Sequence, residues 1–219
     1  HTLDDVSGGD IYLGLAESYQ IRRLAAAIRS FKTACPGLRY HITSGDTEQV
    51  TEKLDKGLLD FAVLVQEPDP AKYHFLPFPE ADVWGVVMPA DCPLAEKEGI
   101  EAADLAGLPL FCSEQGWNHD LPRWCGSRME ELHLEGSFRL SYNGSLFVRE
   151  GLGYLLTFRH LIDTTPGSGL VFRPLKPKLE AGLYLIWKKY QVFTPIAERF
   201  LAMLRAEFGE QQDAPLQTP

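Results

Sequence analysis

The sequence predicts an α/β protein whose sheets are mostly parallel and are flanked by helices. Three observations predict this class: short apolar runs alternate with helical patterns, Gly and Pro separate the two kinds of segment, and a second series of strands follows residue 79. The chain has 219 residues, 45% of them hydrophobic, which suffices for one large domain or two small ones.

The first series of elements reads strand, helix, strand, helix, strand. A buried strand starts near Ile11, and residues 21–28 show helical spacing with Ser18 as the expected cap. The remaining elements are a strand over 38–43, a helix that ends at Gly57 and a strand over 60–65. This order predicts a parallel sheet with right-handed crossovers.

A Pro-rich connection over 67–79 leads to the second series, in which a helix is expected over 120–133. Its strands are expected over 83–88, 108–112, 138–141, 154–158 and 170–172. A late strand over 182–187 precedes the last helix, which Thr194 caps and which ends near Gly209.

The charge of the chain argues against direct binding to nucleic acid. Lys and Arg number 21 against 30 Asp and Glu, so the formal net charge is −9. We see no leader and no apolar run long enough to span a bilayer, although a removed leader or an excised domain stays open. The four scattered cysteines fit reduced thiols of a cytoplasmic protein.

Local arrangements that catalysis or metal binding requires are not found in the sequence. There is no Gly-x-Ser-x-Gly elbow, phosphate-binding loop, His-Glu-x-x-His or dinucleotide-binding glycine motif, and the six histidines are dispersed. We therefore expect no enzyme activity, no catalytic residue, no metal and no cofactor.

Small polar side chains gather where predicted strands lead into helices. They occur at Glu17-Ser18, over residues 43–47 and at Asn143-Gly144-Ser145. The carboxyl ends of parallel strands are the usual ligand site of such sheets, and helix amino termini there favour a small anion or carboxylate. For Ser18, Ser44 or Asp46, and Ser145 taken singly, helix capping alone is the favoured interpretation, although capping and ligand contact can coexist. Tyr19, Trp117, Trp124 and Phe147 are candidates for an aromatic wall or for the core.

Five stretches resemble the regulatory domain of LysR-type transcriptional regulators. They are Gly-Gly-Asp-Ile-Tyr-Leu-Gly at 8–14, Phe-Lys-Thr-Ala-Cys-Pro-Gly-Leu at 31–38, Leu-Asp-Lys-Gly-Leu-Leu-Asp-Phe-Ala at 54–62, the segment 86–95, and Val-Arg-Glu-Gly-Leu-Gly-Tyr at 148–154. The stretches occur in the family's order, and the resemblance as a whole covers about residues 8 to 208. Gly57 suits a left-handed helix cap and Gly151 a tight turn. Where the family commonly has a Pro, this chain has Thr157-Phe158-Arg159.

The resemblance implies a two-lobed fold like that of type II periplasmic binding proteins, with mixed, mostly parallel sheets and two crossover hinge strands. Lobe I would comprise residues 10–79 and 182–209, and lobe II residues 80–181. Residues 1–9 would be a linker remnant and 210–219 a disordered tail. A small effector would bind in the cleft between the lobes. The implied contacts are Ser18, Tyr19, Ser44, Gly45, Asp46, Thr47, Ser113, Trp117, Asn143, Ser145 and Phe147.

The resemblance also implies a cytoplasmic transcriptional sensor. Promoter DNA would be bound only by an N-terminal winged helix-turn-helix that this chain lacks, and no membrane partner is expected. A homodimer is expected through helices at 21–31 and 120–133, with a tetramer in the full-length protein. The alternatives are an extracytoplasmic solute-binding protein of a transporter and, third, an enzyme such as a prephenate-dehydratase-like or deaminase-like protein.

Overall fold

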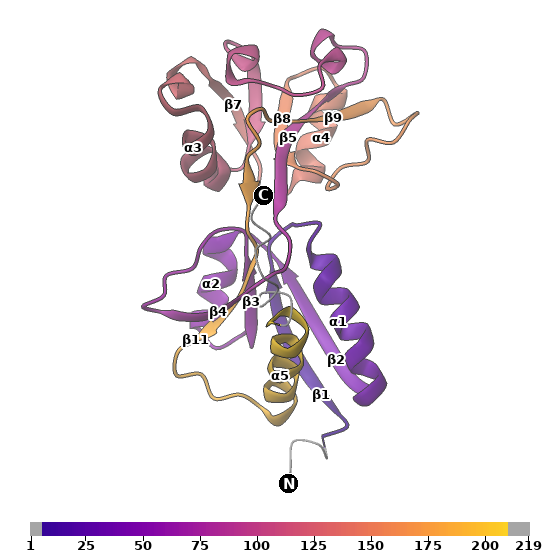
Figure 1. Ribbon diagram of the computed structural model, residues 1–219, viewed down its shortest axis with the longest axis vertical. Helices are drawn as coiled ribbons and strands as arrows, with labels where there is room; N and C mark the ends of the chain where they lie inside the picture. The colour runs from indigo at the N-terminus through magenta and orange to yellow at the C-terminus, as the bar shows by residue number, and fades with distance from the viewer. Residues whose placement is uncertain (1–5, 210–219) are drawn as a thin grey trace, which may run out of the picture. The chain divides into compact units, whose positions relative to one another are not determined.

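The computed structural model describes residues 6–209, which form two compact units (Figure 1). Within the described residues, unit 1 comprises 6–16, 20–81 and 182–209, and unit 2 comprises 17–19 and 82–181. The predicted tail over 210–219 and the first five residues of the predicted linker lie outside the described residues.

Unit 1 is a five-stranded sheet with helices on both faces. The strand order is β2 (Gly37–Ser44), β1 (Gly8–Leu15), β3 (Phe61–Leu64), β11 (Tyr184–Lys188) and β4 (Tyr73–Pro77). β1 pairs with β2 and β3 in parallel, which confirms the predicted parallel core, whereas β11 is antiparallel to β3 and β4.

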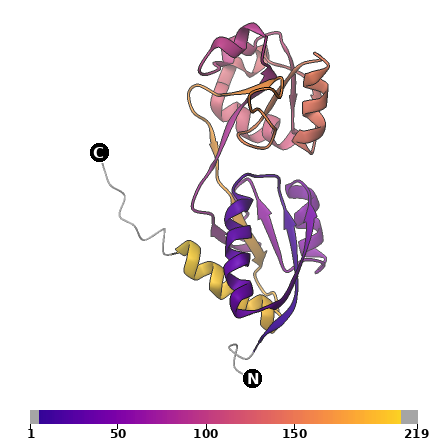
Figure 2. The same cartoon turned by 90° about the vertical axis from the view of Figure 1, so that its right-hand side faces the viewer.

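Side chains alternate between the two faces of this sheet because successive strand residues point in opposite directions. Leu13 and Phe61 pack with α1 (Ile21–Ala34) and α5 (Pro195–Gly209), which lie side by side (Figure 2). Ala62 and Ile186 pack with α2 (Thr47–Asp55) on the opposite face. The sheet thus has one apolar core on each side.

Unit 2 contains a six-stranded sheet. The strand order is β10 (Glu180–Ala181), β5 (Asp82–Pro89), β8 (Tyr154–Phe158), β6 (Pro109–Cys112) and β7 (His133–Ser137), and β9 (Leu170–Pro174) also pairs with β5. Its helices are α3 (Leu121–Cys125) and α4 (Ser141–Arg149), with short helical turns at Pro93–Glu96, Ala102–Leu105, Gly116–Asp120 and Gly126–Glu131. Phe111, Val148 and Leu155 lie in a core cluster of this unit, which includes the inner face of α4.

Several local predictions are confirmed. The strand predicted over 154–158 is β8, and the Thr194 hydroxyl accepts from the Ala197 amide at 3.3 Å at the start of α5. Gly57 and Gly151 both have φ of 75°, which agrees with the left-handed helix cap predicted at Gly57 and the tight turn predicted at Gly151.

Three predicted elements are wrong. The helix over 120–133 is broken because Gly126 ends α3 with a positive φ of 53°, and the chain continues in a tighter turn and then β7. No strand covers 138–141, since β7 ends at Ser137 and α4 begins at Ser141. Ser145 therefore lies inside a helix instead of capping one. The connection over 67–79 contains the strand β4, which β11 pairs along its whole length.

Ser18 does not cap α1. That helix begins at Ile21 with Gln20 in the cap position, and no side chain forms a cap hydrogen bond there. The Ser18 hydroxyl instead donates to a carboxylate in unit 2, as described below.

Candidate functional site

The segment Glu17 to Tyr19 follows β1 but belongs to unit 2. The Ser18 hydroxyl donates to Oδ2 of Asp82 at 2.5 Å, and both residues are buried. The rings of Tyr19 and His160 lie 4.3 Å apart between centroids. Asp82 begins β5 and His160 follows β8, two strands that pair with each other, so the segment is attached at one end of this strand pair.

The amino terminus of α4 meets the same segment. The Ser141 amide donates to Oε1 of Glu17 at 2.7 Å, and the hydroxyls of Ser141 and Thr157 lie 2.6 Å apart. Thr157 is only 3% exposed, so its hydroxyl fixes the start of α4 against β8. We call Glu17, Ser141, Asn143 and Thr157 the α4 site.

Charge at the α4 site is balanced between a carboxylate and a helix terminus. Burial raises the pKa of Glu17, and the hydrogen bond from the Ser141 amide opposes that rise. The positive end of the helix dipole favours the ionised form of this carboxyl group. Within the described residues, no side chain accepts from the amides of Tyr142 and Asn143. The site thus offers amide donors beside a carboxylate acceptor.

The other predicted residues of unit 2 have different surroundings. The Ser113 hydroxyl accepts from the Gly116 amide at 3.1 Å and so caps a turn, and Trp117 is half-buried next to that turn. Ser145 is 2% exposed and donates to the Tyr142 carbonyl at 2.6 Å, whereas Phe147 stacks on Phe138 with centroids 5.1 Å apart. Ser145 faces the interior of the unit, and exposed Asn143 is the predicted residue nearest in sequence to Ser141.

The predicted residues of unit 1 lie together between β2 and α2. Ser44 is the last residue of β2, the Gly45 amide donates to the Leu15 carbonyl at 3.1 Å, and Thr47 begins α2. Asp46 accepts from the Gln49 amide at 2.9 Å, and the Gln49 side chain accepts from the Asp46 amide at 3.0 Å. This reciprocal pair is a capping box. Asp46 therefore caps α2, whereas a contact between Asp46 and a ligand stays a prediction.

Sequence reasoning missed Asp82, Ser141 and Thr157, and it noted Glu17 without making it a site residue. The Ser18–Asp82 pair spans 64 residues and the Glu17–Ser141 pair spans 124, so no local pattern joins the partners. One signal was available, because Thr157 stands in the stretch where the chain departs from the pattern it resembles.

Residues 6–209 contain neither a cluster of metal ligands nor a membrane-spanning helix. No group of three or more His, Cys, Asp or Glu in that range is arranged to hold a metal ion. No helix in the same range is long and apolar enough to cross a membrane. The four cysteines are free thiols, and complete burial raises the pKa of Cys112 far above its ordinary value, so this thiol stays protonated.

A sequence model of the LysR substrate binding domain matches residues 4–209. The chain belongs to this family. Among characterised relatives, the HTH-type transcriptional regulator YtlI of Bacillus subtilis is 26% identical over 184 residues, which are 80% of this chain and 58% of the relative. The Hca operon transcriptional activator HcaR of Escherichia coli is 24% identical over 202 residues, which are 88% of this chain and 66% of the relative. The chain thus spans less than two thirds of either relative.

The effector-binding domain of QuiR, solved in complex with shikimate, has the same fold. It matches with a TM-score of 0.80 and 17% identity over 93% of this chain and 99% of the QuiR chain. The LysR substrate-binding domain described here therefore has the mixed α/β, type II periplasmic-binding-protein-like fold that the sequence predicted. It is the effector-binding domain of a LysR-type regulator.

Proposed function

We propose that this LysR substrate-binding domain binds a small hydroxylated carboxylate at the α4 site and controls transcription through an N-terminal winged helix-turn-helix outside this chain. The observation that carries the proposal is the pairing of the Glu17 carboxylate with the first amide of α4. In the full-length regulator we place this sensor in the cytoplasm, where it meets both metabolites and promoter DNA.

The chemistry of the α4 site selects the effector class. A bare anion would be repelled by the Glu17 carboxylate, whereas a neutral alcohol would leave the Tyr142 and Asn143 amides without an anionic acceptor. A ligand that carries both groups donates a hydroxyl to Glu17 and places its carboxylate at the amides. Shikimate, the ligand of the QuiR domain, has both groups and is the natural first probe.

Subunit pairing is the second part of the proposal. We propose a dimer through α1 and the segment 120–133, and a tetramer of the full-length regulator. Ala25 and Ala26 are exposed on α1. Exposed apolar side chains on a helix suit a self-complementary interface between two copies of the chain. Light scattering of the domain at high concentration tests this: a strict monomer contradicts it.

The alternatives of the sequence analysis are not favoured. The matched relatives are transcriptional regulators and neither transporter components nor enzymes.

The experiment is a thermal-shift screen of hydroxylated carboxylates, starting with shikimate, followed by calorimetry on variants. A ligand at 100 times its Kd stabilises the folded domain by about 2.7 kcal/mol. We expect E17Q and T157V each to weaken binding of the best ligand about tenfold or more, because E17Q removes the carboxylate charge and T157V removes the hydroxyl that contacts Ser141 at the start of α4. E48Q, an exposed change on α2, is the control. Equal binding by E17Q, T157V and wild type would refute the site.

A further inference from the structure

A cavity of about 710 Å³ lies within unit 2 and shares no residue with the α4 site. Its apolar floor is formed by Val83, Pro174 and Leu175. Val83 follows the first residue of β5, and Pro174 is the last residue of β9. The cavity thus lies between the beginning of one strand and the end of its neighbour.

Main-chain hydrogen bonds fix the shape of this cavity. The Ile100 amide donates to the Pro174 carbonyl at 2.9 Å, and the Lys176 amide donates to the Ile100 carbonyl at 2.8 Å. These bonds hold Gly99 beside Lys176, where a Cβ on residue 99 would lie 3.2 Å from the Lys176 Cβ. Because Gly99 has no side chain, the backbone at this position can lie close to Lys176.

The cavity gathers positive charge in a chain whose net charge is −9. Its lining contains four cationic side chains, Lys97, Arg159, Lys176 and Lys178, against the carboxylates of Glu98 and Glu101. Lys97 pairs with Asp104 at 2.5 Å and Lys178 with Glu180 at 2.7 Å.

The two other cationic side chains of the cavity, Arg159 and Lys176, are not neutralised by such a pair among the described residues. Within the described part of the chain, neither Arg159 nor Lys176 forms an ion pair with a carboxylate. The Arg159 guanidinium lies 5.3 Å from the centroid of the Phe172 ring, so an aromatic face positions it and its N–H donors remain available. Arg159 belongs to the stretch in which this chain departs from the family pattern.

We propose that this cavity is a second small-molecule site, which binds an aromatic carboxylate. The carboxylate group is held by Arg159 and Lys176, because unpaired cations form the strong, charge-assisted hydrogen bonds. The ring lies on Val83, Pro174 and Leu175, since an apolar floor with a few convergent polar groups suits such a body. This proposal does not depend on the proposed effector at the α4 site.

The test uses benzoate, benzyl alcohol and inorganic phosphate as probes in amide NMR titrations of the domain. Benzoate is expected to shift the Gly99 and Lys176 amides, and the other two probes, which lack either the charge or the ring, are expected to bind at least about tenfold more weakly. No benzoate shift at these amides up to about 10 mM overturns the proposal. Equal binding of phosphate or benzyl alcohol also overturns it.

Variants locate the binding. R159Q with K176Q is expected to raise the benzoate Kd about tenfold or more. The matched control is R205Q with K53Q, because Arg205 lies over the Trp187 ring at 5.2 Å and both residues are outside the cavity. Equal weakening by the control pair contradicts the assignment. E17Q is expected to leave the benzoate-induced shift of the Gly99 amide unchanged, because Glu17 lies outside this cavity. The failure of this proposal is therefore distinguishable from the failure of the effector proposal.

Discussion

At the scale of single residues, Ser18 has a structural role that its position in the sequence does not reveal. Its hydroxyl donates to the buried carboxyl group of Asp82. S18A is expected to destabilise the domain by about 1–3 kcal/mol, because it leaves a buried acceptor without this donor. Urea denaturation measures the change, and S30A, at an exposed position of α1, is expected to stay within about 0.5 kcal/mol. Equal stability of S18A and wild type contradicts the role.

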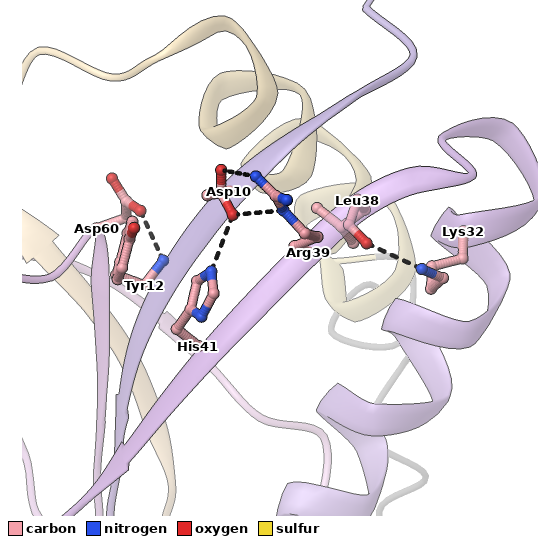
Figure 3. A network of polar contacts seen from close by, with 7 residues as sticks. All are labelled: Asp10, Tyr12, Lys32, Leu38, Arg39, His41 and Asp60. Atoms are coloured by element: carbon pink, nitrogen blue, oxygen red, sulfur yellow. Dashed lines mark hydrogen bonds and ion pairs between the residues drawn. The ribbon is translucent and has the colours of Figure 1, made fainter.

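Asp10 makes the stability of the folded domain depend on pH in the acid range (Figure 3). Hydrogen bonds from Arg39, at 2.9 and 3.0 Å, and a contact with His41 at 2.9 Å lower its pKa from 3.8 to about 2. Because the folded-state pKa is the lower one, the stabilisation is complete above the unfolded pKa and is lost as the pH falls from about 4 to about 2. D10N lacks this titration. Its urea midpoint is therefore expected to fall less than that of wild type between pH 5 and pH 2, and parallel curves contradict the argument.

At the scale of elements, α2 shows how a cap and a candidate ligand contact coincide. Asp46 and Gln49 form the capping box that starts this helix. D46A is expected to cost about 1 kcal/mol of stability, measured by urea denaturation. E48A, in the same first turn but exposed, is the control. If D46A is no less stable than E48A, the capping box contributes nothing to the stability of the domain. If D46A keeps full effector affinity, the predicted contact at residue 46 is wrong.

The elements also show how far the sequence predicts this domain. The alternation of strands and helices in unit 1 was predictable because Ile11, Leu13 and their neighbours carry the periodicity of a buried strand. The break at Gly126 was not, since a single glycine inside a helical pattern is often tolerated. The contacts at the start of α4 could not be predicted from local pattern, because Glu17, Ser141 and Thr157 are far apart in the sequence and meet only in the folded chain.

At the scale of the whole molecule, the net charge of −9 argues against DNA binding by this domain itself. Duplex DNA binding depends on cations that neutralise phosphates. The isolated domain is therefore expected to show no binding to duplex DNA in fluorescence anisotropy at low salt. Salt-sensitive binding by the domain alone would contradict the assignment of DNA contact to an N-terminal domain.

The effector site proposed here lies at the amino terminus of α4. Hydrogen–deuterium exchange of the domain with the best ligand from the screen is its sharpest test. We expect protection of the Tyr142 and Asn143 amides, which lack a side-chain acceptor in the described structure, and little change in α5. A screen that yields no ligand, or protection that leaves these two amides unchanged, would contradict it.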